Sequence, residues 1–208
     1  MTEYYDNLET RSNGQRTSDL VSSIQKQLVH ARDNTEAYAE SLQGHDCEGF
    51  GSLDQLSKFP VTRKSELMER QKQQPPLGGF AVIEPGQLRY INVSPGPVYE
   101  ACTHRSDFWR MARALYAAGF RAGDLVHNCF SYHLTPAGMM LDSGCQALGC
   151  GVIPGGVGQT EMQVQTINDL KPNGYVGTPS FLKIILEKAD ELELDASSII
   201  RGLVSGEA

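Results

Sequence analysis

The chain has 208 residues, of which 40% are hydrophobic and 21% are charged, and its formal net charge is −7 at pH 7. This balance is that of a globular protein with one large domain, or one domain with an appendage. The negative charge disfavours a nucleic-acid partner. No stretch approaches about 18 consecutive apolar residues, and the start "MTEYYDNLETR" lacks the apolar core of a signal peptide, so we expect no membrane association and a cytoplasmic protein.

The cysteines and histidines do not form a recognisable metal motif. The five cysteines are irregularly spaced in mostly apolar surroundings and are expected to be reduced, structural thiols. His127, Cys129 and His133 lie close in sequence, but no CxxC or HxxxH pair supports them as ligands. We therefore expect no metal site in these residues.

Residues 1–75 predict a helical region that precedes the main body of the protein. Apolar residues recur at helical spacing over 17–42, with Thr17 or Ser18 as the N-cap, and a second helix follows Pro60 with Thr62 as its N-cap. After a proline- and glycine-rich linker, the segments "AVI" and "LRYINV" predict a hairpin whose turn is Glu84-Pro85-Gly86-Gln87. We assign residues 76–208 to the α/β part.

Beyond residue 105, helical and strand patterns alternate along the chain. Strands are expected over 124–130, 150–154, 173–177 and 199–206, and helices over 106–119, 135–149, 159–170 and 179–192. This alternation predicts an α/β fold with a mostly parallel sheet flanked by helices. Ligands bind at the carboxyl ends of such strands, so one face should carry the four loops at 130–133, 154–158, 177–178 and 205–208.

Three of these loops carry residues suited to ligand binding. Gly155, Gly156 and Gly158 allow close backbone approach, and Thr160 with Gln163 fits a capping box that opens a helix beside them. The spacing is neither a Walker loop nor GxGxxG, so an ordinary glycine-rich turn is an equal alternative.

Two further pairs lie at strand ends. Thr178 and Pro179 fit an N-cap and first helical position, for which ordinary capping is the alternative to a ligand role. Tyr132 could form a pocket wall and His133 could move protons, although a lone histidine is more often a surface residue. The absence of a G-x-S-x-G motif disfavours a serine hydrolase.

Several segments together resemble the phenylacetate–CoA ligase family of adenylate-forming acyl-CoA synthetases. These are "LSKFPVTRKSEL", "AAGFRAGDLVHN", "LGCGVIPGGVGQTEMQVQTINDLKPNGYVGTPSFL" and the terminal "VSGEA", matched in order along nearly the whole chain. The resemblance implies a two-step reaction, in which a carboxylate and ATP form an acyl-adenylate and CoA then forms the thioester. It also implies Mg²⁺, which with cationic groups offsets the negative charge of the phosphates.

The resemblance carries roles to individual residues but assigns no catalytic residue within this chain. Tyr132, with Phe130 and Phe181 nearby in sequence, favours an aromatic or apolar acid as the substrate. The expected partners are this acid and a nucleotide, and a homodimer is left open. The resemblance implies these substrate-binding residues: Tyr132, Pro154, Gly155, Gly156, Gly158, Thr178 and Pro179; His133 is added from its place at the strand end. The expected nucleotide-binding residues are Ser94, Gly96, Ser205, Gly206, Glu207 and Ala208.

Two departures from the family pattern leave an alternative open. The family continues past the position of Ala208 into a Mg²⁺ ligand, a ribose-binding aspartate and a lid with a catalytic lysine, so we expect a fragment that is inactive by itself. The family's phosphate loop falls on Ser94-Pro95-Gly96-Pro97, where two prolines remove amide donors and no lysine follows. The alternative is a non-catalytic or repurposed relative that binds an acyl or nucleotide ligand.

Overall fold

The structure, a computed structural model, describes residues 3–207, so Ala208 lies outside the described residues. The chain divides into two compact units, one of residues 6–103 and one of residues 104–207 with residues 3–5. The predicted domain division after residue 75 stays a prediction. Among the described residues, every helix is too short or too polar to cross a membrane.

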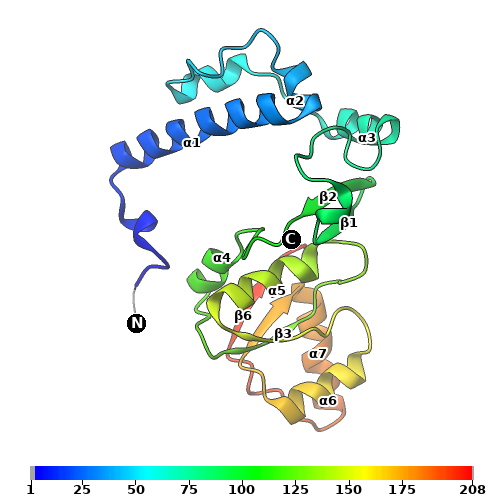
Figure 1. Cartoon of the computed structure of the whole chain (residues 1–208). Coiled ribbons are helices and arrows are strands. Elements are labelled where there is room, and N and C mark those ends of the chain that lie inside the picture. The colour runs from blue at the N-terminus through cyan, green and yellow to red at the C-terminus, as the bar shows by residue number, and fades with distance from the viewer. Residues whose placement is uncertain (1–2, 208) are drawn as a thin grey trace. The chain divides into compact units, whose positions relative to one another are not determined.

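The first unit is built around the long helix α1 (Asn13–Asn34), which is followed by the short helix α2 (Glu36–Ser41) (Figure 1). The prediction of one helix over 17–42 was wrong because Thr35 interrupts it. The Thr35 hydroxyl donates to the carbonyl of Ala31 at 2.8 Å and accepts from the amide of Tyr38 at 3.3 Å, so it ends one helix and caps the next. The N-cap of α1 is Ser12, upstream of the predicted Thr17 or Ser18.

Short 3-10 turns and one further helix complete the helical part of this unit. Helix α3 (Lys64–Gln73) begins after Arg63, whose amide donates to the carboxylate of Glu66 at 3.2 Å, so Thr62 is not the N-cap. The 3-10 turns are η1 (Asn7–Thr10), η2 (Leu53–Lys58) and η3 (Pro85–Gln87).

A two-stranded antiparallel hairpin ends the first unit. The segment predicted as its second strand forms its first strand instead. Its strands are β1 (Tyr90–Ser94) and β2 (Val98–Cys102), and residues 95–97 form the turn. The predicted turn at 84–87 forms η3 instead. The carboxamide of Gln71 in α3 fixes β2, because it donates to the carbonyl of Tyr99 at 2.8 Å and accepts from the Tyr99 amide at 2.9 Å.

The second unit has the predicted α/β fold. Its strands β3 (Leu125–Asn128), β4 (Gly151–Ile153), β5 (Gly174–Gly177) and β6 (Arg201–Val204) are all parallel, in the order β4-β3-β5-β6. The helices between and before them are α4 (Ala112–Ala117), α5 (Ala137–Leu148), α6 (Thr160–Leu170) and α7 (Pro179–Glu191). Helix α4 is shorter than predicted because the Asp107 carboxylate accepts from the amides of Met111 and Ala112 and caps it there.

The helices form layers on both faces of this sheet (Figure 1). On one face Val126 and Val176 pack with Leu115 of α4 and Leu141 of α5, and on the other face Tyr175 packs with residues of α6 and α7. The chain leaves β3 toward β4 on one side and returns to β5 on the other side of β3. The carboxyl ends of β3 and β5 therefore mark the switch point, where open α/β sheets bind ligands.

A buried carboxylate ties the amino ends of three strands together. Asp124 accepts from the Arg121 amide at 2.7 Å, from Asn173 Nδ2 at 2.8 Å and from Arg201 Nη1 at 2.5 Å. Burial by itself would raise the pKa of Asp124, but these three donors outweigh it and hold the pKa below its usual value.

We expect Asp124→Asn to lower the free energy of unfolding by about 2–4 kcal/mol at neutral pH, because Arg201 loses a buried partner. The folded pKa is lowered, so the carboxylate stabilises the fold above the unfolded pKa of about 3.9, and this contribution is lost as the pH falls through the folded value. Urea unfolding of both proteins should show their difference shrinking toward about pH 3. A difference that does not change with pH would contradict this role.

Candidate functional site

The four loops at the carboxyl ends of the parallel strands lie against one another. The amide of Gly156 donates to the carbonyl of Asn128 at 2.9 Å, and the amide of Ser205 donates to the carbonyl of Gly177 at 3.1 Å. A Cβ on Gly206 would lie 3.5 Å from Cγ2 of Thr178. The predicted grouping of these loops on one edge is therefore confirmed.

Tyr132 is held at this edge by two hydrogen bonds of its hydroxyl. Nδ2 of Asn128 donates to the Tyr132 hydroxyl at 2.8 Å, and that hydroxyl donates to the Asp142 carboxylate at 3.4 Å. Burial and the charge of Asp142 raise the pKa of Tyr132, so the phenol keeps its proton. The ring lies over Gly138, where a Cβ would be 2.8 Å from Cδ2 of Tyr132.

His133 lies beside Tyr132 in sequence but is exposed. Its backbone amide donates to the Ser131 hydroxyl at 3.2 Å, and within residues 3–207 its ring makes no hydrogen bond or ion pair. A proton-transfer role for His133 stays a prediction.

The glycine-rich loop joins β4 to α6 without the predicted capping box. Gln159 is the N-cap of α6, in a left-handed conformation with φ of 50°. The side chain of Gln163 does not reach back to Thr160. Its Nε2 donates to the carbonyls of Gly156 at 3.0 Å and Gly158 at 2.6 Å, so the Gln163 side chain links the glycine-rich loop to α6.

The other end of the Gln163 carboxamide reaches β3. Its Oε1 lies 2.7 Å from Nε2 of His127 and accepts from the thiol of Cys129 at 3.1 Å. Sequence reasoning did not assign His127, Asn128 or Gln163 to the site. The available signal was a pair of polar residues, His127 and Asn128, in a strand expected to be buried.

The start of α7 holds two of the predicted segments together. The Thr178 hydroxyl accepts from the Phe181 amide at 3.3 Å and Pro179 is the first helical residue, so the predicted capping is confirmed. The Ser180 hydroxyl donates to the Glu207 carboxylate at 2.6 Å, and the Ser180 amide donates to it at 3.2 Å. These contacts, led by the Ser180 hydroxyl, lower the pKa of Glu207.

Ser94 is the last residue of β1 and Gly96 lies in the hairpin turn that follows it. The Ser94 hydroxyl contacts the Val98 carbonyl at 3.5 Å, and Nζ of Lys64 donates to the Pro95 carbonyl. A Cβ on Gly96 would lie 3.2 Å from Cε of Lys64. The turn therefore has a neighbouring lysine, which the local sequence did not reveal because it comes from α3.

The described residues do not form a Mg²⁺ site. Among residues 3–207, no three His, Cys, Asp or Glu side chains converge as ligands. The Glu207 carboxylate at the edge already accepts from Ser180.

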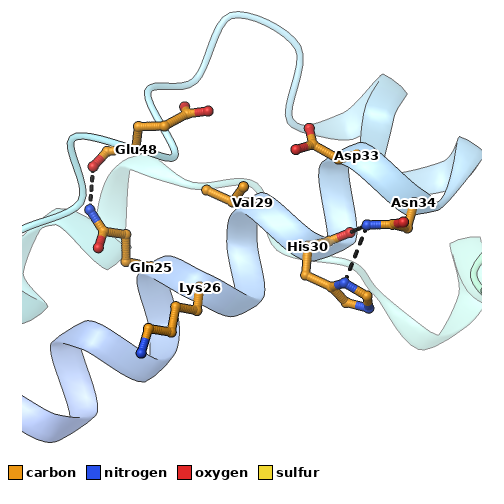
Figure 2. Close-up of a pocket in the computed structure, with 7 residues that line it drawn as sticks. All are labelled: Gln25, Lys26, Val29, His30, Asp33, Asn34 and Glu48. Carbon is orange, nitrogen blue, oxygen red and sulfur yellow. Dashed lines mark hydrogen bonds between the residues drawn. The ribbon is translucent and has the colours of Figure 1, made fainter.

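A separate surface hollow lies along α1 in the first unit (Figure 2). Most of its polar groups already have partners: Asn34 Nδ2 donates to the His30 carbonyl at 2.8 Å and to its Nδ1 at 3.2 Å, and Gln25 donates to the Glu48 carbonyl. The carboxylates of Asp33 and Glu48 accept from Arg32. Figure 2 shows the side chains spread along the helix, with Lys26 directed away from Asp33. The hollow therefore lacks convergent groups for chemistry.

We expect Gly138→Ala to lower the free energy of unfolding by about 1–3 kcal/mol, because its Cβ would meet the Ser131 carbonyl and the Tyr132 ring at 2.8 Å. Gly14→Ala is the matched control, since Gly14 is also the second residue of its helix and has open space around it. This control should be neutral or stabilising by up to about 1 kcal/mol. Equal effects of the two substitutions in urea unfolding would contradict the packing of Tyr132 on Gly138.

No protein-family model matches the chain. Curated relatives do: a phenylacetate-coenzyme A ligase of Aromatoleum evansii is 34% identical over 197 residues, covering 90% of this chain and 44% of the relative. One of Escherichia coli is 33% identical over 202 residues, covering 92% and 45%. The chain thus spans less than half the length of the curated relatives it matches.

Solved structures agree on the fold. An open conformation of 2-hydroxyisobutyryl-CoA ligase, in complex with 2-HIB-AMP and CoA, has a TM-score of 0.86 and 23% identity, covering 94% of this chain and 45% of the other. A postadenylation state of the same ligase has a TM-score of 0.85 and 24% identity, covering 93% and 43%. By sequence the chain is phenylacetate–coenzyme A ligase-like over most of its own length, matching less than half of each curated relative, and its fold is that of a solved acyl-CoA ligase.

Proposed function

We propose that this chain is the part of a carboxylate–CoA ligase that holds the acyl group and the adenylate, and that the complete protein joins an acid to CoA with ATP. One observation supports this proposal most strongly. At a single edge of the sheet, beside the switch point between β3 and β5, lie Tyr132, the loop at 154–158 and the segment at 205–207. The ligase names of the curated relatives support the reaction class.

In this proposal each loop has one task. The ring of Tyr132, braced by Asn128 and Asp142, forms the wall of the acyl pocket. The loop of Pro154, Gly155, Gly156 and Gly158 borders the acyl group and its carboxylate with backbone alone. Ser205, Gly206 and Glu207 border the adenine, and Thr178 and Pro179 border the substrate next to them.

We propose an aromatic or apolar acid as the substrate. The side chain of Phe130 reaches the same edge, where its Cε1 would lie 4.0 Å from a Cβ on Gly206. Phe130 and Tyr132 therefore supply aromatic surface on one loop, and the phenol of Tyr132 is neutral. A flat apolar group gains most from such a surface.

ATP supplies the phosphate leaving group that makes a carboxylate reactive, and CoA supplies the thiol that accepts the acyl group. Residues 3–207 hold no cluster for Mg²⁺, so we assign no step through that ion to this chain. We assign the complete reaction to the full protein, because the chain spans less than half of each curated relative.

The hairpin turn favours a second candidate function, a relative that binds an acyl or nucleotide ligand without using ATP. Pro95 and Pro97 have no amide hydrogen, and the nearby Lys64 ammonium bonds the Pro95 carbonyl. This turn offers fewer donors to a triphosphate than a glycine- and lysine-rich loop would.

Binding of ATP separates the two candidates. For a ligase, calorimetry of the complete protein should show saturable ATP binding that requires Mg²⁺, and phenylacetate with CoA should then yield a thioester. Binding of a phenylacetyl sulfamoyl-adenosine analogue without any ATP binding would instead support the second candidate.

We expect Tyr132→Ala to weaken binding of that analogue by about tenfold to a hundredfold, because the pocket loses an aromatic wall. Tyr132→Phe should retain most of the affinity, since it keeps the ring and loses only the hydroxyl contacts. Tyr4→Ala, at an exposed tyrosine, is the control and should leave affinity unchanged. Unaltered selectivity of Tyr132→Ala across a panel of aromatic and aliphatic acids would count against the pocket role.

A further inference from the structure

The carboxamide of Gln163 has only one orientation that satisfies its neighbours. Two backbone carbonyls, those of Gly156 and Gly158, face one end of it at 3.0 and 2.6 Å, and carbonyls only accept hydrogen bonds. That end must be the NH₂ group. The oxygen therefore faces β3, where it lies 2.7 Å from Nε2 of His127 and 3.1 Å from Sγ of Cys129.

This orientation determines the proton positions on β3. Because an amide oxygen can only accept, both neighbours must donate: His127 carries its proton on Nε2, and Cys129 is a thiol. Burial lowers the pKa of His127 and raises the pKa of Cys129 to about 12, in keeping with a neutral ring and a protonated sulfur. Nδ1 of His127 is then a bare acceptor, buried without a partner among the described residues.

The glycine at position 155 is explained by the same contacts. Its backbone is not in the left-handed region, so conformational freedom does not require a glycine there. A Cβ on Gly155 would lie 2.7 Å from Oε1 of Gln163 and 2.9 Å from Nε2 of His127. Position 155 therefore lacks a side chain because the hydrogen bond between Gln163 and His127 occupies the space.

We infer that Gln163 is a positioning residue for ligand binding: oriented by His127 in its Nε2–H tautomer, it ties the carbonyls of Gly156 and Gly158 to α6 and so sets the shape of the glycine-rich loop. This inference rests on the proposed function, in which that loop borders the acyl-adenylate. Gln163 and His127 act on the ligand through the glycine-rich loop and need not touch the ligand themselves.

Gln163→Glu separates the contact of the side chain with His127 from its contacts with the two loop carbonyls. It keeps the size and the acceptor facing His127 but removes both N–H donors, so the carbonyls of Gly156 and Gly158 lose their partner. Gln165→Glu is the control, because Gln165 is an exposed glutamine of the same helix. Gly155→Ala tests the contact from the other side, since it displaces the carboxamide without removing a polar group.

We expect two changes in the variants and one NMR signature in the wild type. In Gln163→Glu, amide hydrogen exchange over 155–160 should accelerate, and affinity for the phenylacetyl sulfamoyl-adenosine analogue should fall by about tenfold or more, as misplacement of a binding loop predicts. Gly155→Ala should do the same, and Gln165→Glu should change neither. In the wild type, ¹⁵N shifts of the His127 ring should report a proton on Nε2 and none on Nδ1.

The inference would be overturned by an Nδ1–H tautomer in the wild type, or by wild-type loop exchange and affinity in Gln163→Glu. A destabilised but otherwise native Gln163→Glu, with unaltered affinity per folded molecule, would likewise reduce Gln163 to a structural residue. The proposed function fails separately, if the wild type does not bind the analogue while loop exchange still depends on Gln163.

Discussion

The central strand β3 imposes the constraint on which the candidate site depends. It is hydrogen-bonded to a strand on each side and covered by helices on both faces, so any polar side chain on it must find a partner inside the protein. It nevertheless ends in His127 and Asn128. Successive residues of a strand point to opposite faces, so His127 meets α6 through Gln163 and Asn128 meets the Tyr132 loop and α5. Two adjacent residues thus order the two loops that flank the switch point.

Much of the fold of residues 104–207 could be predicted from the sequence, because its signals are local. Short apolar runs bounded by glycine and proline mark the strands, and Gly149 and Thr178 mark a helix end and a helix start as expected. The alternation of elements then leaves few topologies, and the shared edge of the four loops follows from the parallel sheet.

The remaining features depend on contacts between residues far apart in sequence. The hairpin turn lies at 95–97 and not at 84–87. Gln71 of the preceding helix α3 hydrogen-bonds the edge of β2 at Tyr99, and the local sequence does not reveal this contact. Gln163 fitted a capping box with Thr160 on spacing alone, but two loop carbonyls and His127 offered it more hydrogen bonds. Likewise, no local pattern in 94–97 reveals that Lys64 lies beside the turn.

The two hydrogen bonds between Gln71 and the backbone of β2 affect how readily the hairpin associates with other molecules. An exposed strand edge presents unpaired N–H and C=O groups, which recruit strands from other molecules and start aggregation. At Tyr99 both groups are already satisfied by a side chain of the same unit, in the pattern a third strand would use. A hairpin of only two strands thereby blocks one point of edge-to-edge association without extending its sheet, and it does so with one carboxamide that is itself buried.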